Sequence, residues 1–185
     1  MTTTLLIVAA IILLPILWAI LTYNALVRRR TIVDEAWSGI DAQLKRRADL
    51  IPNVIETVRG YVAHERGTLD ELTRLRIGAP PAAVAARASA EQEVSAALGR
   101  VLAVAEGYPD LKASANFQAL QAALAELEDQ IQLARRFYNG AVRDLNVTVG
   151  QFPSNLIARQ GGFESAEFFT LENAGDRALP KVSFG

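Results

Sequence analysis

The feature that most constrains this chain is an apolar run near its N-terminus. Every residue from 5 to 27 is apolar or only mildly polar, and Arg28, Arg29 and Arg30 follow directly. A helix over residues 5–27 measures about 34 Å at 1.5 Å per residue, which is enough to cross a hydrocarbon core of about 30 Å. The sequence therefore predicts a single transmembrane helix that contacts the lipid bilayer through residues 5–27.

The charges around this run predict its orientation. Arg28, Arg29 and Arg30 lie on the C-terminal flank, and the segment before the run carries no basic side chain. The positive-inside rule keeps such a flank in the cytoplasm. The run also lacks a small-residue cleavage site at its end, which argues against removal as a secretory signal. We expect a single-pass protein of the cell membrane, with the N-terminus outside and the C-terminal domain in the cytoplasm.

Composition excludes several kinds of chemistry. The chain has 19 basic and 20 acidic residues, so it lacks the basic excess of a nucleic-acid-binding protein. It has no cysteine and a single histidine, His64, whereas a catalytic zinc site needs two or three ligands at defined spacings. We expect no nucleic acid, no metal, no cofactor and no catalytic residue; a hydrolase that uses His64 with Glu65 is the weakest alternative.

Helical periodicity continues past the arginines. Apolar residues recur every three or four positions at Val33, Trp37, Ile40, Leu44, Ala48 and Ile51, then at Ile55, Val58, Val62, Leu69, Leu72 and Leu75. This spacing marks one face of a helix. We expect the anchor to run on as one long helix, with a kink or short break near Pro52 because proline removes a backbone hydrogen bond. A loop is predicted at residues 78–81, and a further helix over 82–106.

The clearest stripe lies in the C-terminal half. Its apolar residues are spaced alternately three and four positions apart, at Phe117, Leu120, Leu124, Leu127, Ile131, Ala134, Tyr138, Ala141 and Leu145. Such heptad spacing favours coiled-coil-like packing between long helices. The predicted fold is all-α: an N-terminal transmembrane helix that continues into an antiparallel helical bundle of three to four long helices.

These patterns suggest three parts. Residues 1–30 are the anchor, 31–162 the helical bundle and 163–185 a Phe-rich tail without clear periodicity. The tail contains Phe163, Phe168, Phe169 and Phe184 among acidic residues, and it is either docked or disordered.

Two basic clusters admit two interpretations. Arg46 and Arg47 form one with Lys45, and Arg135 and Arg136 form the other. Solvated helix faces are the common fate of such clusters. Alternatively, Arg47 or Arg136 reaches across the bundle to a carboxylate, with Asn53 and Asn139 as buried polar partners. Trp37 and Tyr61 are interpreted as core residues with a satisfied polar tip.

Several short strings have no obvious structural reason for their wording. They include Glu35-Ala36-Trp37-Ser38, Asp49-Leu50-Ile51-Pro52-Asn53, Gly60-Tyr61, Tyr108-Pro109-Asp110-Leu111-Lys112, Arg135-Arg136 with Tyr138-Asn139, and Gly162-Phe163. In number, order and spacing they resemble the LemA family over residues 23–163. The resemblance implies a bacterial membrane-anchored helical bundle with no established biochemical activity. Some members carry a lipoprotein-type cysteine at the N-terminus, from which this chain departs.

The motif residues with an expected structural or interaction role are Trp37, Asp41, Arg46, Arg47, Asp49, Pro52, Asn53, Tyr61, Arg135, Arg136, Tyr138, Asn139 and Phe163. The leading function is a scaffold or adaptor, not an enzyme, that presents helical faces to other membrane or cytoplasmic proteins or to a second copy of itself. An accessory or regulator of a membrane protease is the alternative, which the resemblance suggests through gene neighbourhoods in the family.

Overall fold

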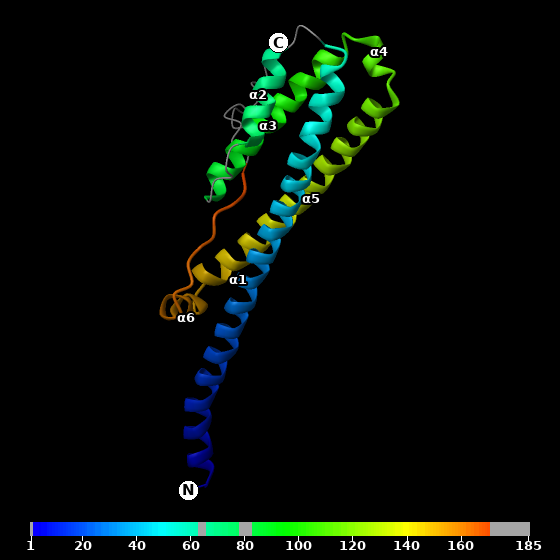
Figure 1. The fold of residues 1–185 in the computed structure, drawn as a ribbon. Coiled ribbons are helices and arrows are strands. Elements are labelled where there is room, and N and C mark those ends of the chain that lie inside the picture. Colours follow the sequence, from blue (N-terminus) through cyan, green and yellow to red (C-terminus); the bar gives the residue numbers. More distant parts are fainter. Residues whose placement is uncertain (1, 63–65, 78–82, 171–185) are drawn as a thin grey trace, which may run out of the picture. The chain divides into compact units, whose positions relative to one another are not determined.

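A computed structural model describes residues 2–62, 66–77 and 83–170, and all regular elements in these ranges are helices. They are α1 (Thr2–Arg59), α2 (Arg66–Ile77), α3 (Val84–Ala105), α4 (Pro109–Lys112), α5 (Ala115–Gly150) and α6 (Ser154–Gln160) (Figure 1). The all-α prediction is confirmed. The chain forms two compact units, and both α1 and α5 contribute residues to each.

The first unit comprises residues 1–41 and 133–167. Here α5 runs antiparallel to α1 (Figure 1), as two contacts require: Trp37 meets Tyr138, and Arg29 meets Asp144. The core of this unit is formed by Leu26, Val33, Ala36, Ile40, Tyr138, Val142, Leu145 and Ala158. An apolar seam between two long helices therefore organises the unit.

The N-terminal part of α1 lies outside this core. The helix contains an 18-residue window of mean hydropathy 2.9, none of it buried in the protein, so it is long and apolar enough to cross a membrane. Large apolar side chains are exposed from Leu5 to Leu21, whereas Leu26 is fully buried. The exposed apolar side chains of α1 thus give way to protein contacts by Leu26.

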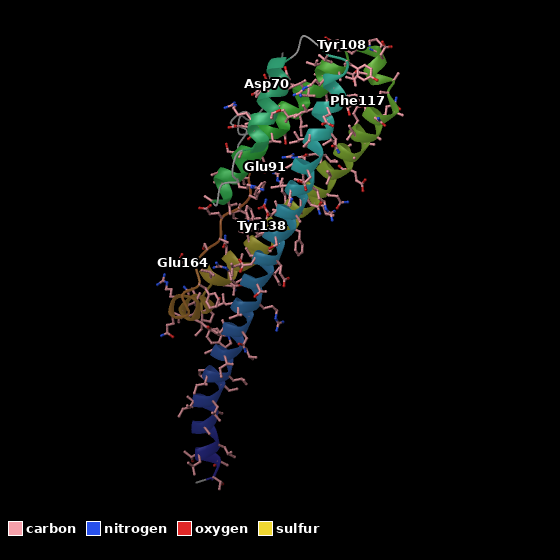
Figure 2. All side chains as sticks on the ribbon, viewed as in Figure 1. Asp70, Glu91, Tyr108, Phe117, Tyr138 and Glu164 are labelled. Atoms are coloured by element: carbon pink, nitrogen blue, oxygen red, sulfur yellow. The ribbon has the colours of Figure 1, made fainter. Side chains whose placement is uncertain are left out.

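The second unit comprises residues 42–132 and the chain from 168 onward. Its core contains apolar side chains from α1, α2, α3, α4 and α5, among them Ile51, Val54, Val58, Leu72, Val101, Leu111 and Phe117. Helices α2 and α3 are neighbours in sequence and pack against each other. Phe117 and Tyr108, at the start of α5 and of α4, are labelled in Figure 2.

Of the kink or short break expected near Pro52, the break is wrong, because α1 runs unbroken from Thr2 to Arg59. Proline within a helix costs about 3 kcal/mol. Ile51, Val54 and Ile55 are all buried around it. Burial of such side chains stabilises by about 1.5–3 kcal/mol each, so their packing outweighs the lost backbone bond.

The helix ends instead at Arg59, so the stripe from Ile55 to Leu75 is not one helix. The amides of Tyr61 and Val62 both donate to the Val58 carbonyl, closing a turn after Gly60. Val62 is buried, but Tyr61 is 46 % exposed, which contradicts its interpretation as a core residue. The loop predicted at residues 78–81 lies outside the described residues.

The heptad stripe of α5 is confirmed in its register. Side chains are buried at every seventh position, namely Phe117, Leu124, Ile131, Tyr138 and Leu145. The intervening positions of the stripe, Leu120, Leu127, Ala134 and Ala141, are half-buried. A repeat of seven residues keeps one face of a helix toward its partners over many turns, which explains how α5 serves both units.

Candidate functional site

Arg47 is a buried cation of the second unit. Its side chain is 4 % exposed and reaches from α1 to α3 and α5. One terminal nitrogen donates to the Glu91 carboxylate at 2.6 Å and to the Glu91 carbonyl at 3.2 Å. The other donates to the Ser95 hydroxyl at 2.8 Å and the Glu128 carboxylate at 3.3 Å. Of the two interpretations of this basic cluster, the structure favours the contact across helices for Arg47.

A second buried arginine completes the cluster. The Nε atom of Arg87 lies 3.2 Å from the Glu91 carboxylate, one helical turn away on α3. Two cations and two carboxylates, Glu91 and Glu128, thus meet at one place. Burying charges is costly unless each has a partner, and here both ends of the Arg47 fork are already engaged. The cluster fixes three helices against one another and leaves little capacity for an ionic ligand.

An apolar cavity of about 500 Å³ adjoins the cluster. Its lining consists of Leu98, Gly99 and Leu102 on α3, Gln121, Leu124 and Ala125 on α5, and Arg47, Ser95 and Glu128 at the charged end. Most of this lining is aliphatic, so the cavity suits an apolar group more than an ion.

In the first unit, an aromatic pair holds the chain that follows α6. The rings of Trp37 and Tyr138 lie 5.5 Å apart between centroids, and the Tyr138 hydroxyl donates to the Glu167 carbonyl at 2.9 Å. Burial raises the pKa of the Tyr138 phenol, and the Glu167 and Asp34 carboxylates raise it further. Tyr138, labelled in Figure 2, therefore remains a neutral hydrogen-bond donor at physiological pH.

Asn146 provides a second contact to the segment that follows α6. Its side-chain amide donates to the Ala166 carbonyl at 2.9 Å, and its oxygen accepts from the Ala166 amide at 2.8 Å. Such a two-way contact satisfies both backbone groups of one residue. The part of the tail in the first unit is therefore docked, and Phe169 in the second unit is buried as well. Residues 171–185 of the predicted tail lie outside the described residues.

The end of α6 brings Phe163 onto α1. Gly162 has a φ of +71°, a conformation that glycine adopts without strain. The Phe163 amide donates a hydrogen bond to the Ala158 carbonyl at 2.9 Å, which closes the end of α6. A Cβ on Gly161 would lie 2.7 Å from the Phe163 ring and 3.1 Å from Tyr23. Glycine at this position permits the edge contact between Tyr23 and Phe163.

The outer face of α5 is apolar where it faces away from the buried seam. Leu133 and Phe137 are 56 % and 62 % exposed, and Val147 is also exposed. Together with Gly140 they fall within about 80° of arc at 100° per residue, opposite Ile131 and Val142. We define the outer face of α5 as Leu133, Phe137, Gly140 and Val147.

The other motif residues do not gather into one site. Asp41, Arg46, Asn53 and Arg136 are exposed, Pro52, Arg135 and Asn139 are half-buried, and exposed Asp49 pairs with Lys45 at 3.2 Å. Exposure of Asn53 contradicts its interpretation as a buried polar partner. His64 and Glu65 lie outside the described residues. Within the described ranges, no group of three or more His, Asp or Glu residues is placed to hold a metal ion.

Comparison with known proteins decides the family. The model of the LemA family matches residues 36–184, most of the chain. The chain belongs to the LemA family. The Protein LemA of Metamycoplasma hominis is 27 % identical over 139 residues, which cover 74 % of this chain and 64 % of that protein.

Two further relatives are magnetosome proteins by name. Magnetosome protein MamQ 2 of Paramagnetospirillum magneticum is 36 % identical, and Magnetosome protein MamQ of Magnetospirillum gryphiswaldense is 30 % identical, each over 83 residues. These matches cover 45 % of this LemA-family chain and 30 % of the MamQ proteins, so the chain spans less than a third of their length. The family and its relatives agree with a membrane-associated protein, and their names specify no reaction.

Several residues that shape this LemA-family chain were not predicted. Glu91 and Arg87 lie in an alanine-rich helix whose polar residues look solvated in sequence. Asn146 matches a glycosylation triplet with Thr148. The sequence did offer one indication for Asn146: it directly follows Leu145, the last residue of the apolar stripe of α5, and so lies at the edge of the buried face.

Proposed function

We propose that this protein is a membrane-anchored adaptor, in which α1 spans a bilayer and the outer face of α5 binds another protein. The observation that carries the proposal is the second apolar face of α5. One side of the helix is buried at every seventh residue, and the opposite side exposes Leu133, Phe137 and Val147. Large apolar side chains grouped on one exposed face are typical of protein contacts.

The anchor supports the same proposal. Most of the large apolar side chains from Leu5 to Leu21 are exposed, and a lipid bilayer is the environment that suits them. Arg28, Arg29 and Arg30 follow the run, so we place the units of the chain on the cytoplasmic side. An anchored helix bundle with an apolar outer face is suited to hold a partner near the membrane.

Site-specific photocrosslinking in living cells tests the adaptor role. We expect p-benzoylphenylalanine in place of Phe137 to give discrete adducts with another protein. The matched control carries the same group in place of Glu35, an exposed acidic position of α1 in the same unit. Leu133→Asp should abolish the adduct at position 137, because a charge in an apolar contact is costly to bury.

Three results would contradict the proposal. Absence of adducts at position 137, or identical adducts at 137 and 35, would show that the outer face of α5 is not a selective contact. An adduct of twice the chain's mass would identify a second copy of this protein, and the face would then serve self-assembly.

A further inference from the structure

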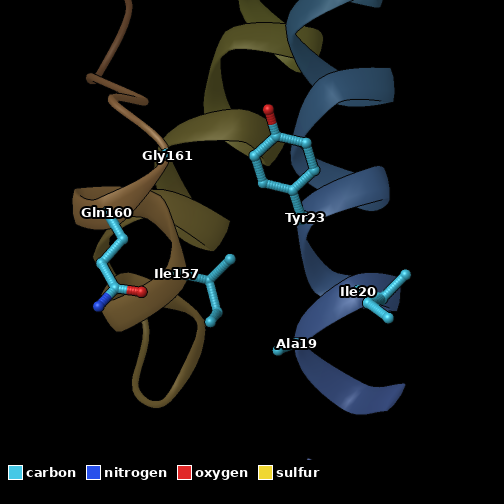
Figure 3. A pocket seen from close by; sticks show the side chains of 6 residues that line it. All are labelled: Ala19, Ile20, Tyr23, Ile157, Gln160 and Gly161. Carbon is cyan, nitrogen blue, oxygen red and sulfur yellow. The ribbon is translucent and has the colours of Figure 1, made fainter. Parts of the chain in front are cut away.

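Helix α6 lies against the part of α1 that belongs to the apolar run. A cavity of about 340 Å³ separates them, lined by Ala19, Ile20 and Tyr23 of α1 and by Ile157, Gln160 and Gly161 at the end of α6. Figure 3 shows Ile157 pointing from α6 toward Ala19. The edge contact of Phe163 with Tyr23, at 5.5 Å between ring centroids, holds the end of α6 at this level.

The length of α1 sets the depth of this contact. From Leu5, where the apolar run begins, to Tyr23 the helix rises about 27 Å, close to the thickness of a hydrocarbon core. Beyond that point protein replaces lipid, because Leu26 is fully buried and Arg29 donates to the Asp144 carbonyl at 2.5 Å. The boundary of the bilayer therefore falls near Tyr23, the residue that α6 contacts.

The outward side chains around α6 have the chemistry of that boundary. Phe152, just before α6, is 74 % exposed, and Leu156 within it is 52 % exposed. Arg159 and Gln160, one turn farther on, are exposed polar residues. Apolar and aromatic side chains beside a basic residue are typical of helices that lie in the headgroup region of a membrane. Trp18 and Tyr23 on α1 are partly exposed aromatic residues at the same level, as in an interfacial belt.

We infer that α6 is a second membrane contact, in which Phe152 and Leu156 enter the headgroup region of the leaflet nearest to Arg28. The occupant is lipid and not a protein partner, because α6 packs on the stretch of α1 where the bilayer ends. The contact would fix the tilt and rotation of the first unit at the membrane, which a single spanning helix leaves free. This inference rests on the anchoring of α1 that the proposed function includes.

Depth-dependent fluorescence quenching tests the inference on the full chain. The protein contains no cysteine, so Phe152→Cys and Leu156→Cys each take a single NBD label. The labelled variants are reconstituted in phosphatidylcholine–phosphatidylglycerol vesicles with doxyl-labelled lipid. Phe137→Cys is the matched control, because Phe137 is a similarly exposed aromatic residue of the first unit on α5. Leu13→Cys, within the apolar run, reports anchoring of α1 separately.

The expected result is quenching by doxyl lipid at positions 152 and 156 that exceeds the quenching at 137 by about twofold or more, with protection from aqueous iodide. Labels at 152 and 156 that behave like the label at 137 would overturn the inference, while quenching at 13 would leave the anchor intact. Protection from both quenchers would overturn it in favour of a second copy of the chain covering α6. Lack of lipid quenching at 13 would overturn the anchoring itself.

Discussion

Ile131→Asp is expected to lower the free energy of unfolding by more than about 3 kcal/mol, because it places an unpaired carboxylate in the buried seam of α5. Ile131 is 3 % exposed and occupies one of the buried heptad positions. Leu127→Asp should have a smaller effect, since Leu127 is half-buried. The measurement is urea unfolding of the full chain in detergent, followed by circular dichroism.

Leu133→Asp is the matched control, two residues away on the same helix. Leu133 is mostly exposed, so the added charge stays hydrated and the unfolding free energy should change by less than about 0.5 kcal/mol. Equal unfolding curves for the two aspartate variants would show that the seam of α5 faces solvent. The same Leu133 variant is expected to lose the photocrosslink, which separates folding from binding.

Arg47→Met is expected to lower the free energy of unfolding by about 2–3 kcal/mol, because it removes the cation that compensates a buried carboxylate. Most of this cost comes from Glu91, whose side chain is 16 % exposed, while Glu128 is 46 % exposed and can hydrate. Arg87 stays beside Glu91, which keeps the expected cost below the roughly 3–5 kcal/mol of a fully buried pair that loses one partner.

A double variant isolates the charge effect. Arg47→Met with Glu91→Leu removes both charges of the closest contact, so it should recover part of the stability lost in Arg47→Met alone. Urea unfolding of the wild type, both single variants and the double variant gives the coupling energy. Additive losses would mean that Arg47 and Glu91 do not interact in solution, contrary to the 2.6 Å contact.

The sequence was most informative where one physical effect dominates. The stripe through Phe117, Ile131 and Leu145 predicted the long helix α5 because burial on one face follows a strict period. The sequence was misleading at Pro52, because the low helix propensity of proline opposed the burial of several neighbouring side chains. Propensity is local and readable, whereas the packing around Ile51 and Val54 depends on helices that are distant in sequence.

The candidate sites were less accessible to prediction for the same reason. The contact of Arg47 with Glu91 joins residues 44 positions apart, and nothing in either local pattern selects that partner over a hydrated one. The outer face of α5 is likewise hidden in sequence. Leu133 and Phe137 look like additional core residues, and only the position of the neighbouring helices shows that they are exposed.

Labelling of a single cysteine tests whether α1 anchors the chain with its helical units on the cytoplasmic side, as we propose. Ala119 is an exposed, small residue of α5, and the chain offers no other thiol, so Ala119→Cys provides a single reporter. A membrane-impermeant maleimide is applied to intact spheroplasts and, in parallel, after lysis. We expect labelling only after lysis, because the positive-inside rule favours a cytoplasmic position for the flank with Arg28, Arg29 and Arg30. Labelling of intact spheroplasts would instead place the helical units on the outer face of the membrane and rule out the proposed orientation.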